Sequence, residues 1–204
     1  MRHINSEQIT DFSALYDENV EMISVSRPPS TELEGLANHL FDARSVIETQ
    51  WLQEVSDEDA PRKALQTSIE DQRLGKLCEE IALGADILGE LLGVSQVGVR
   101  VGTLSSPMCP RFHADQVPCR MLMTVSGPGT EWIANDDVDE AVLADRENQE
   151  PPVRSGGKIR ELAQGRWSLL KGGTWQENFY GVIHRSPHQE GQRLLVSLDP
   201  VFAG

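Results

Sequence analysis

The sequence predicts an α+β fold in a single domain, residues 1–204. A mainly helical N-terminal part, residues 1–95, is followed by an antiparallel sandwich or barrel, residues 96–204. Two observations predict this division. Before Gly93, apolar residues recur at helical intervals. After Gly93, short runs typical of strands are separated by Gly and Pro, without the intervening helices of a parallel-sheet fold.

The N-terminal elements follow from spacing. Residues 20–29, VEMISVSRPP, alternate weakly like a strand that the two prolines end. Thr31 and Glu34 then have the spacing of a capping box, so we expect a helix directly after the prolines. Residues 61–92 carry apolar side chains at helical intervals, which predicts one long helix or two shorter ones with Gly93 as the stop.

The C-terminal part contains seven short strand-like runs. They are residues 97–104, 111–115, 119–127, 130–134, 165–173, 180–187 and 193–202. One long interruption, residues 135–164, begins with an acidic stretch and passes through RSGGK. Because long loops over barrels are often lids, we expect a flap with a short helix and a glycine hinge; a merely solvated insertion is the alternative.

Composition limits the possible partners. The chain has 18 Lys and Arg against 32 Asp and Glu, a net charge of −14, which repels polyphosphate backbones and argues against nucleic-acid binding. No segment approaches the roughly 18 apolar residues that span a membrane, and the first residues lack the apolar run of a secretion signal. We therefore expect a cytoplasmic protein whose three cysteines are thiols or metal ligands.

The stretch CPRFHADQVPC, residues 109–119, contains candidate metal ligands. Cys109 and Cys119 would lie about 33 Å apart if the segment were extended, and the C-x2-C spacing of zinc sites is missing, so a zinc knot closed by both is disfavoured. His113 and Asp115 are two residues apart, so on a strand they would project from one face and could chelate one metal. An ordinary half-buried strand with satisfied polar groups is the alternative.

A third ligand is expected from His184, in the run YGVIHRSP. Two histidines and one carboxylate on one face leave open coordination positions on non-haem Fe(II). Arg193 follows nine residues after His184, at the start of the next strand. An inward guanidinium there could bind a carboxylate bidentately and hold an organic acid whose other end chelates the metal.

In this order, His113, Asp115, His184 and Arg193 resemble the signature of the Fe(II)/2-oxoglutarate-dependent dioxygenases, over about residues 97–202. The resemblance implies a C-terminal double-stranded β-helix, a jelly-roll or cupin-like fold, with the N-terminal helices packed on it. It also implies Fe(II) at the first three residues, 2-oxoglutarate paired with Arg193, and a substrate oxidised under the flap.

The motifs CPRFHAD, GPGTEW, HRSP and DPVF are similar to those of an uncharacterised bacterial family of about this length. Its members often occur beside genes for zinc handling, including metal-chaperone GTPases, which implies a link to zinc homeostasis. The second functional hypothesis is therefore a non-enzymatic metal-binding protein that holds zinc with the same ligands, with Cys109 or Cys119 as an optional fourth donor.

Further residues are expected around the site. Some members of the dioxygenase superfamily carry R-x-S, whereas leucines follow Arg193, so Ser197 or another strand must supply any hydroxyl. Arg120 and Arg185 are competing anion partners, and Arg120 is a second candidate for binding the co-substrate. Trp132 is a candidate for the substrate pocket, with plain core packing as its alternative. Cys109 and Cys119 are expected to flank the ligands.

Overall fold

The computed structural model describes the chain except for residues 70–72, 178, 189–190 and 203–204. Its strands are β1 (Arg2–Ser6), β2 (Val20–Ser26), β3 (Glu48–Glu54), β4 (Gln96–Leu104), β5 (Cys119–Ser126), β6 (Glu131–Ile133), β7 (Ile159–Glu161), β8 (Arg166–Lys171), β9 (Ile183–Arg185) and β10 (Arg193–Val201). Its helices are α1 (Thr31–Asp42), α2 (Ala60–Leu65), α3 (Leu74–Leu92) and α4 (Glu140–Ala144), with 3-10 turns η1 (Ile9–Tyr16) and η2 (Asn135–Asp137).

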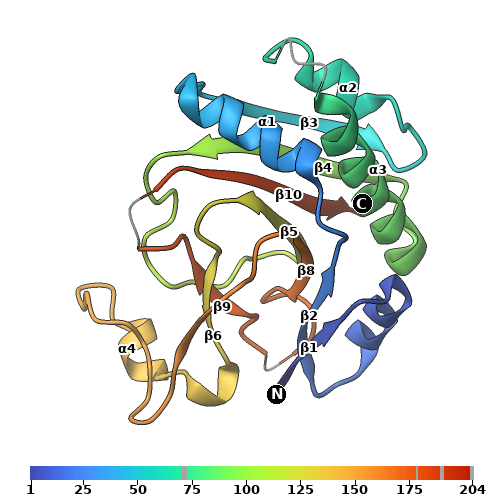
Figure 1. Cartoon of the computed structure of the whole chain (residues 1–204). Coiled ribbons are helices and arrows are strands. Elements are labelled where there is room, and N and C mark those ends of the chain that lie inside the picture. Colours follow the sequence, from blue (N-terminus) through green and yellow to red (C-terminus); the bar gives the residue numbers. More distant parts are fainter. Residues whose placement is uncertain (70–72, 178, 189–190, 203–204) are drawn as a thin grey trace.

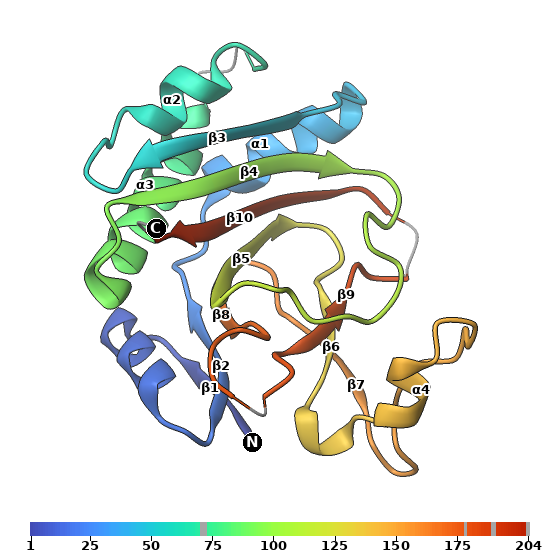
Figure 2. The same cartoon turned by 180° about the vertical axis from the view of Figure 1, so that it is seen from behind.

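The strands form two sheets. The larger has the order β1-β2-β8-β5-β10-β4-β3, and the smaller has the order β7-β6-β9. Among the described strands, only β1 and β2 pair in parallel. Figures 1 and 2 show the larger sheet curving so that its concave side faces the smaller sheet, while α1 and α3 cover its convex side. Side chains from distant strands therefore meet on the concave side.

The N-terminal part supplies the long helices, as predicted, but it also supplies three strands of the larger sheet. Of these, only β2 coincides with a predicted run, residues 20–29. β3 was missed because it is an edge strand with a weak apolar signal: Gln53 is its one buried residue. The boundary between residues 95 and 96 thus does not separate helices from sheet.

The predicted cap of the first helix needs a correction, whereas the second helical stretch forms one of the two expected arrangements. Ser30 is the N-cap of α1, because its hydroxyl accepts a hydrogen bond from the Leu33 amide at 3.3 Å, so Thr31 is the first helical residue and not the cap. The pattern over residues 61–92 forms two helices, α2 and α3. α3 ends at Gly93, whose φ of 68° lies in the left-handed region that favours glycine.

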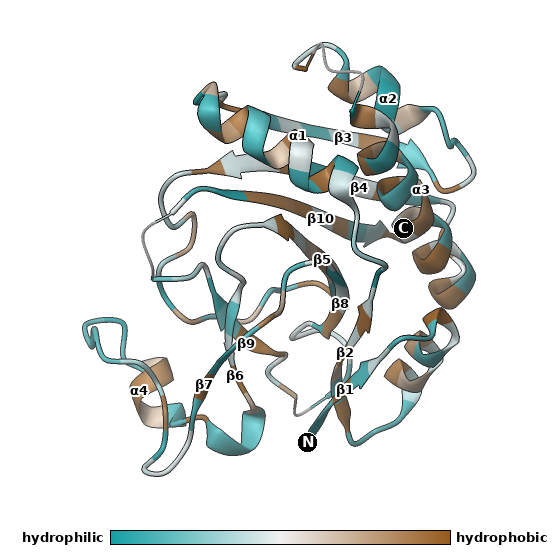
Figure 3. Cartoon of the chain, viewed as in Figure 1, coloured by the Kyte–Doolittle hydropathy of each residue, from teal (hydrophilic) through white to brown (hydrophobic). Residues whose placement is uncertain are grey.

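The main hydrophobic core lies between the helices and the convex side of the larger sheet. Leu194, Val196 and Leu198 of β10 are fully buried in it. Because successive strand residues point to opposite faces, Arg193 and Ser197 are directed to the concave side. Figure 3 shows hydrophobic residues concentrated on β5, β8, β10 and α3, whereas the loops next to α4 are hydrophilic.

Six of the seven C-terminal runs contain a strand, but residues 111–115 do not. Within that run only His113 pairs, through an isolated antiparallel bridge to His184. The flap, residues 135–164, contains the predicted short helix, α4, and also η2 and β7. In the described part of the chain, no helix combines the length and the apolar character needed to cross a membrane.

Candidate metal centre

Three predicted ligands converge on the concave side of the fold. One ligand atom each from His113, Asp115 and His184 lies within 4.8 Å of the other two. The His113 Nε2 is 3.8 Å from Asp115 Oδ1, and the His184 Nε2 is 3.4 Å from Asp115 Oδ2. The bridge between the two histidines joins their backbones at 3.0 and 2.9 Å, so a local pairing brings together ligands 71 positions apart.

Both histidines present the same ring nitrogen to the centre. The Nδ1 of His113 lies 2.9 Å from the Arg111 carbonyl, and the Nδ1 of His184 lies 2.9 Å from the Val182 carbonyl. A carbonyl can only accept, so each Nδ1 carries the proton and donates it. In the neutral rings, each Nε2 therefore offers its lone pair, which is the form that binds a metal.

The Asp115 carboxylate has one engaged and one free oxygen. Its Oδ1 accepts a hydrogen bond from Arg120 Nη1 at 2.9 Å. Its Oδ2 is buried and has no hydrogen-bond partner among the described residues. Burial alone would raise the pKa of this carboxyl, but His184, Arg120 and His113 outweigh burial and leave the pKa below its usual value. Asp115 is therefore a half-buried carboxylate whose buried Oδ2 is an unused donor atom.

This donor set fits a divalent cation. Ligands at about 2.1 Å from a metal lie about 3.0–3.4 Å from one another, so the observed 3.4 and 3.8 Å separations need only a small contraction. A buried charged oxygen without a partner costs about 1–3 kcal/mol or more, a cost that a bound cation would remove. Two imidazoles and one carboxylate suit Fe(II) or Zn(II).

The segment after Asp115 is held by a pair of glycines. The Gly173 amide donates to the Asp115 carbonyl and the Gly172 amide donates to the Pro118 carbonyl, both at 2.8 Å. A Cβ on Gly172 would lie 1.9 Å from the Val117 carbonyl oxygen, so this approach requires glycine. His113 and Asp115 thus converge as predicted, although a pinned loop and not a regular strand aligns them.

Arg193 is buried on the concave side at the start of β10, with 3% of its surface exposed. Its Nη2 donates to the hydroxyls of Thr124 and Thr130 at 3.1 and 3.0 Å, while its buried Nε has no partner among the described residues. Burial lowers its pKa to about 10, so the guanidinium is still charged at neutral pH. A buried cation with an unused N–H donor can bind an anion.

The hydroxyls beside Arg193 come from outside β10, which is one of the two expected sources. Thr124 and Thr130 supply the hydroxyls, whereas Ser197 makes no hydrogen bond to Arg193 in the described structure. Arg120 does not stand free for a co-substrate, because its Nε and Nη2 bind the Asp199 carboxylate at 2.7 and 2.8 Å and its Nη1 binds Asp115. The only sequence signal for Thr124 as a site residue was its polar side chain within a largely apolar strand, CRMLMTVS.

Arg185 and Trp132 are also engaged elsewhere. The Arg185 Nε donates to Glu131 at 2.7 Å, and its guanidinium lies 4.3 Å from the centre of the Phe112 ring. Trp132 is packed with Leu122 and other buried residues in a second core cluster between the sheets. Trp132 is therefore a core residue, which was the alternative to a place in the substrate pocket.

The cysteines stay outside the ligand cluster. Cys119 is buried with Met121 and Met123 in the main core, on the face of β5 opposite Arg120. Cys109 is exposed, and its backbone is joined to Ser186. In the described part of the chain, no cysteine belongs to a three-residue group that could hold a metal.

We expect the thiols to react in an order set by burial. Burial raises the pKa of Cys119 to about 12, so almost no thiolate exists at pH 8, whereas Cys109 is exposed. Titration of the native protein with Ellman's reagent should label Cys109 first, and Cys109→Ser should remove the fast phase. A fast phase that survives Cys109→Ser and is lost in Cys119→Ser would contradict this placement.

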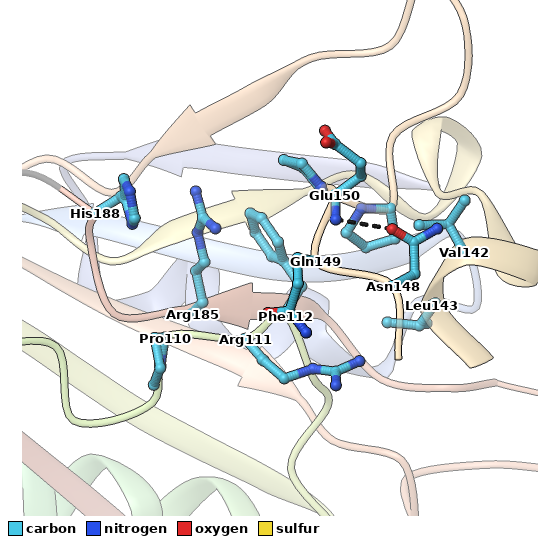
Figure 4. A pocket seen from close by; sticks show the side chains of 12 residues that line it. Pro110, Arg111, Phe112, Val142, Leu143, Asn148, Gln149, Glu150, Arg185 and His188 are labelled. Carbon is cyan, nitrogen blue, oxygen red and sulfur yellow. Dashed lines mark hydrogen bonds between the residues drawn. The ribbon is translucent and has the colours of Figure 1, made fainter. Parts of the chain in front are cut away.

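Two cavities are lined by Arg111 and Phe112 together with residues of the flap. One, of about 470 Å³, is lined by His113 and by residues 111, 112, 114, 116, 143, 146, 180 and 183. The other, of about 170 Å³, lies between Phe112 and the loop after α4, with Arg185 and His188 at its edge (Figure 4). The larger cavity thus reaches a candidate ligand.

The chain matches a protein-family model and is similar in fold to solved structures. A model of the family described as "Protein of unknown function (DUF1826)" matches residues 6–199. A sequence search of curated proteins finds no match. Several solved structures have a similar fold.

The Arabidopsis thaliana dioxygenase for auxin oxidation 1, in complex with 2-oxoglutarate, aligns with a TM-score of 0.58 and 10% identity over 100% of this chain and 93% of that chain. The rice dioxygenase for auxin oxidation gives 0.55 and 14% over 98% and 83%. The Fe(II)/α-ketoglutarate-dependent dioxygenase TqaL gives 0.51 and 12% over 94% and 86%. These likenesses confirm the predicted jelly-roll fold.

Proposed function

Because the chain belongs to the DUF1826 family and shares its fold with Fe(II)/2-oxoglutarate-dependent dioxygenases, we propose that it is an Fe(II)/2-oxoglutarate-dependent oxygenase. One observation supports this most strongly. A convergent His113, Asp115 and His184 group occurs together with Arg193, a buried cation whose Nε has no partner among the described residues. A protein that only stores a metal has no need of such a cation.

Each residue has a distinct task in this proposal. His113 and His184 hold the metal through Nε2, and Asp115 holds it through Oδ2. Arg193 binds the far carboxylate of 2-oxoglutarate, with Thr124 orienting the guanidinium. Fe(II) at this position would supply the oxidation of a substrate coupled to the decarboxylation of 2-oxoglutarate.

Arg120 is a positioning residue in the same proposal. By binding Asp115 Oδ1, it leaves only Oδ2 for the metal, so the carboxylate takes one coordination position and not two. Asp199 holds Arg120 in place through two hydrogen bonds. The arrangement leaves positions open for the two oxygen donors of the co-substrate.

We expect Arg120→Gln to weaken 2-oxoglutarate chelation about tenfold while metal is still bound, because a freed Oδ1 can occupy a second metal position. Asp199→Asn is the matched control: it keeps Arg120 on Asp115 and should have a much smaller effect. Both variants are compared by metal analysis and by titration of the chelate absorption band. Equal losses of metal and of 2-oxoglutarate affinity in Arg120→Gln would argue against this role.

The proposed function is tested with the purified protein. The bound metal is determined first, and Fe(II) and 2-oxoglutarate are then added without oxygen. A visible metal-to-ligand charge-transfer band is expected, because 2-oxoglutarate chelates the iron through its keto and carboxylate oxygens. The band should be lost in His113→Ala and kept in Cys109→Ala and Cys119→Ala.

The same experiment separates the oxygenase from the second hypothesis, zinc binding without catalysis. Zinc that resists exchange by Fe(II), together with no absorption band at saturating 2-oxoglutarate, would overturn the oxygenase proposal. The imidazole and carboxylate donors accept either metal, so metal content alone does not decide between the two. The absorption band does decide, because it requires the co-substrate on iron.

A further inference from the structure

The cavity of about 470 Å³ beside His113 has the features of a substrate pocket. Its volume is within the range of small-molecule sites. Phe112, Ala114, Leu143 and Ile183 give it an apolar wall, and Leu143 brings in the flap. Because His113 lines the cavity, a molecule bound in it would lie beside one of the three candidate metal ligands.

The charge of this cavity is opposite to that of the whole chain. Its lining includes two arginines, Arg111 and Arg146, and no Asp or Glu among the described residues. Each of four other surface cavities includes at least one carboxylate. In a chain with 32 acidic and 18 basic side chains, a lining with cations alone attracts anions.

Arg111 is held in place beside the flap. Its guanidinium donates to the backbone carbonyls of Arg146 and of Asp145, the latter at 3.1 Å. Figure 4 shows its side chain extending toward Leu143 of α4. These two hydrogen bonds use only part of the five N–H donors of the guanidinium, so donors remain for a ligand.

Arg146 is the free cation of the pair. Its exposed side chain forms no hydrogen bond or ion pair with any residue in the described part of the chain, and only its backbone carbonyl is engaged, by Arg111. The carboxylate of its neighbour Asp145 accepts from the Glu147 amide at 3.0 Å and so is engaged within its own loop. A guanidinium without a partner at the edge of an apolar cavity can bind one carboxylate.

We propose that this cavity binds the substrate, and that the substrate is an organic carboxylate with an apolar body. This inference rests on the proposed oxygenase function. The apolar body lies against Phe112, Leu143 and Ile183, and the carboxylate binds Arg146 with help from Arg111. When the carboxylate is bound at the flap side of the cavity, the carbon atoms of the substrate that lie near His113 are directed toward the metal.

The test uses three probes that share one apolar body: 4-phenylbutanoate, 4-phenylbutanol and 4-phenylbutylammonium. Each is titrated calorimetrically into the metal-free protein and then added, without oxygen, to protein loaded with Fe(II) and 2-oxoglutarate. The carboxylate should bind most tightly and the ammonium least. Arg146→Gln should weaken only the carboxylate, about tenfold. Arg154→Gln, an equal charge change on the flap but outside the cavity, should have no effect.

Three results would overturn the proposal. The alcohol could bind as tightly as the carboxylate, Arg154→Gln could match Arg146→Gln, or Arg193→Leu could abolish carboxylate binding, which would place the probe at the co-substrate site. Failure of the oxygenase proposal is recognised separately. In that case the loaded protein shows no chelate band, while the calorimetric result on metal-free protein still decides whether the cavity prefers the carboxylate.

Discussion

Asp115→Ala should lower the affinity for Fe(II) or Zn(II) at least about 100-fold, which corresponds to about 2.7 kcal/mol. Asp115 supplies the only carboxylate of the three-residue group, and its Oδ2 is buried without another partner among the described residues. Two imidazoles alone hold a divalent cation poorly, because the variant lacks the third ligand and the negative charge that complete the three-residue face. Competition with a chromophoric chelator measures the change.

The metal-free Asp115→Ala protein should nevertheless stay folded. Its melting temperature should fall by only a few degrees, because the substitution removes the hydrogen bond between Asp115 and Arg120 but also removes a buried oxygen that lacks a partner among the described residues. Arg120 keeps Asp199 as its partner. Asp86→Ala, on an exposed position of α3, is the control and should bind metal normally. Unchanged metal affinity in Asp115→Ala would contradict the proposed centre.

Arg193→Leu should weaken 2-oxoglutarate binding about 100-fold and leave metal affinity unchanged. A bidentate pair between a guanidinium and a carboxylate contributes about 1.5–3 kcal/mol, and leucine removes it. Arg193 touches Thr124 and Thr130 but none of the three metal ligands. Titration of the chelate band with 2-oxoglutarate, at constant Fe(II), gives the affinity.

Arg193→Lys serves as the matched variant. Lysine keeps the charge but loses the planar fork, so its 2-oxoglutarate affinity should lie between those of the parent and Arg193→Leu. Protein stability gives a second readout. In the ligand-free state, Arg193→Leu should not lower the melting temperature strongly, because the buried guanidinium has an unpaired Nε. If Arg193→Leu loses metal and co-substrate together, Arg193 belongs to the metal centre and not to a co-substrate site.

The predictability of the fold varied with the strength of the local signal. Gly93 was predictable as a helix stop because only a residue without Cβ adopts its φ of 68° easily. β10 was predictable because its apolar run is long and buried. β1 and β3 were not, because both lie at the edges of the larger sheet and have mostly polar, partly exposed residues. Hydrogen bonds to the neighbouring strands stabilise β1 and β3, whose own residues have little strand propensity.

The candidate site was predictable in its residue types but not in its contacts. The sequence alone singled out His113, Asp115 and His184 as a candidate ligand set, with Arg193 at the distance of the next strand, because local spacing and the resemblance to the dioxygenase signature both point to these positions.

Only the tertiary structure decided that Arg120 binds Asp115 and Asp199, that Thr124 and Thr130 hold Arg193, and that Cys119 faces the opposite side of its strand. The physical reason is that hydrogen bonds between strands depend on register and on the face of each strand. Those are set by packing between residues far apart in the sequence.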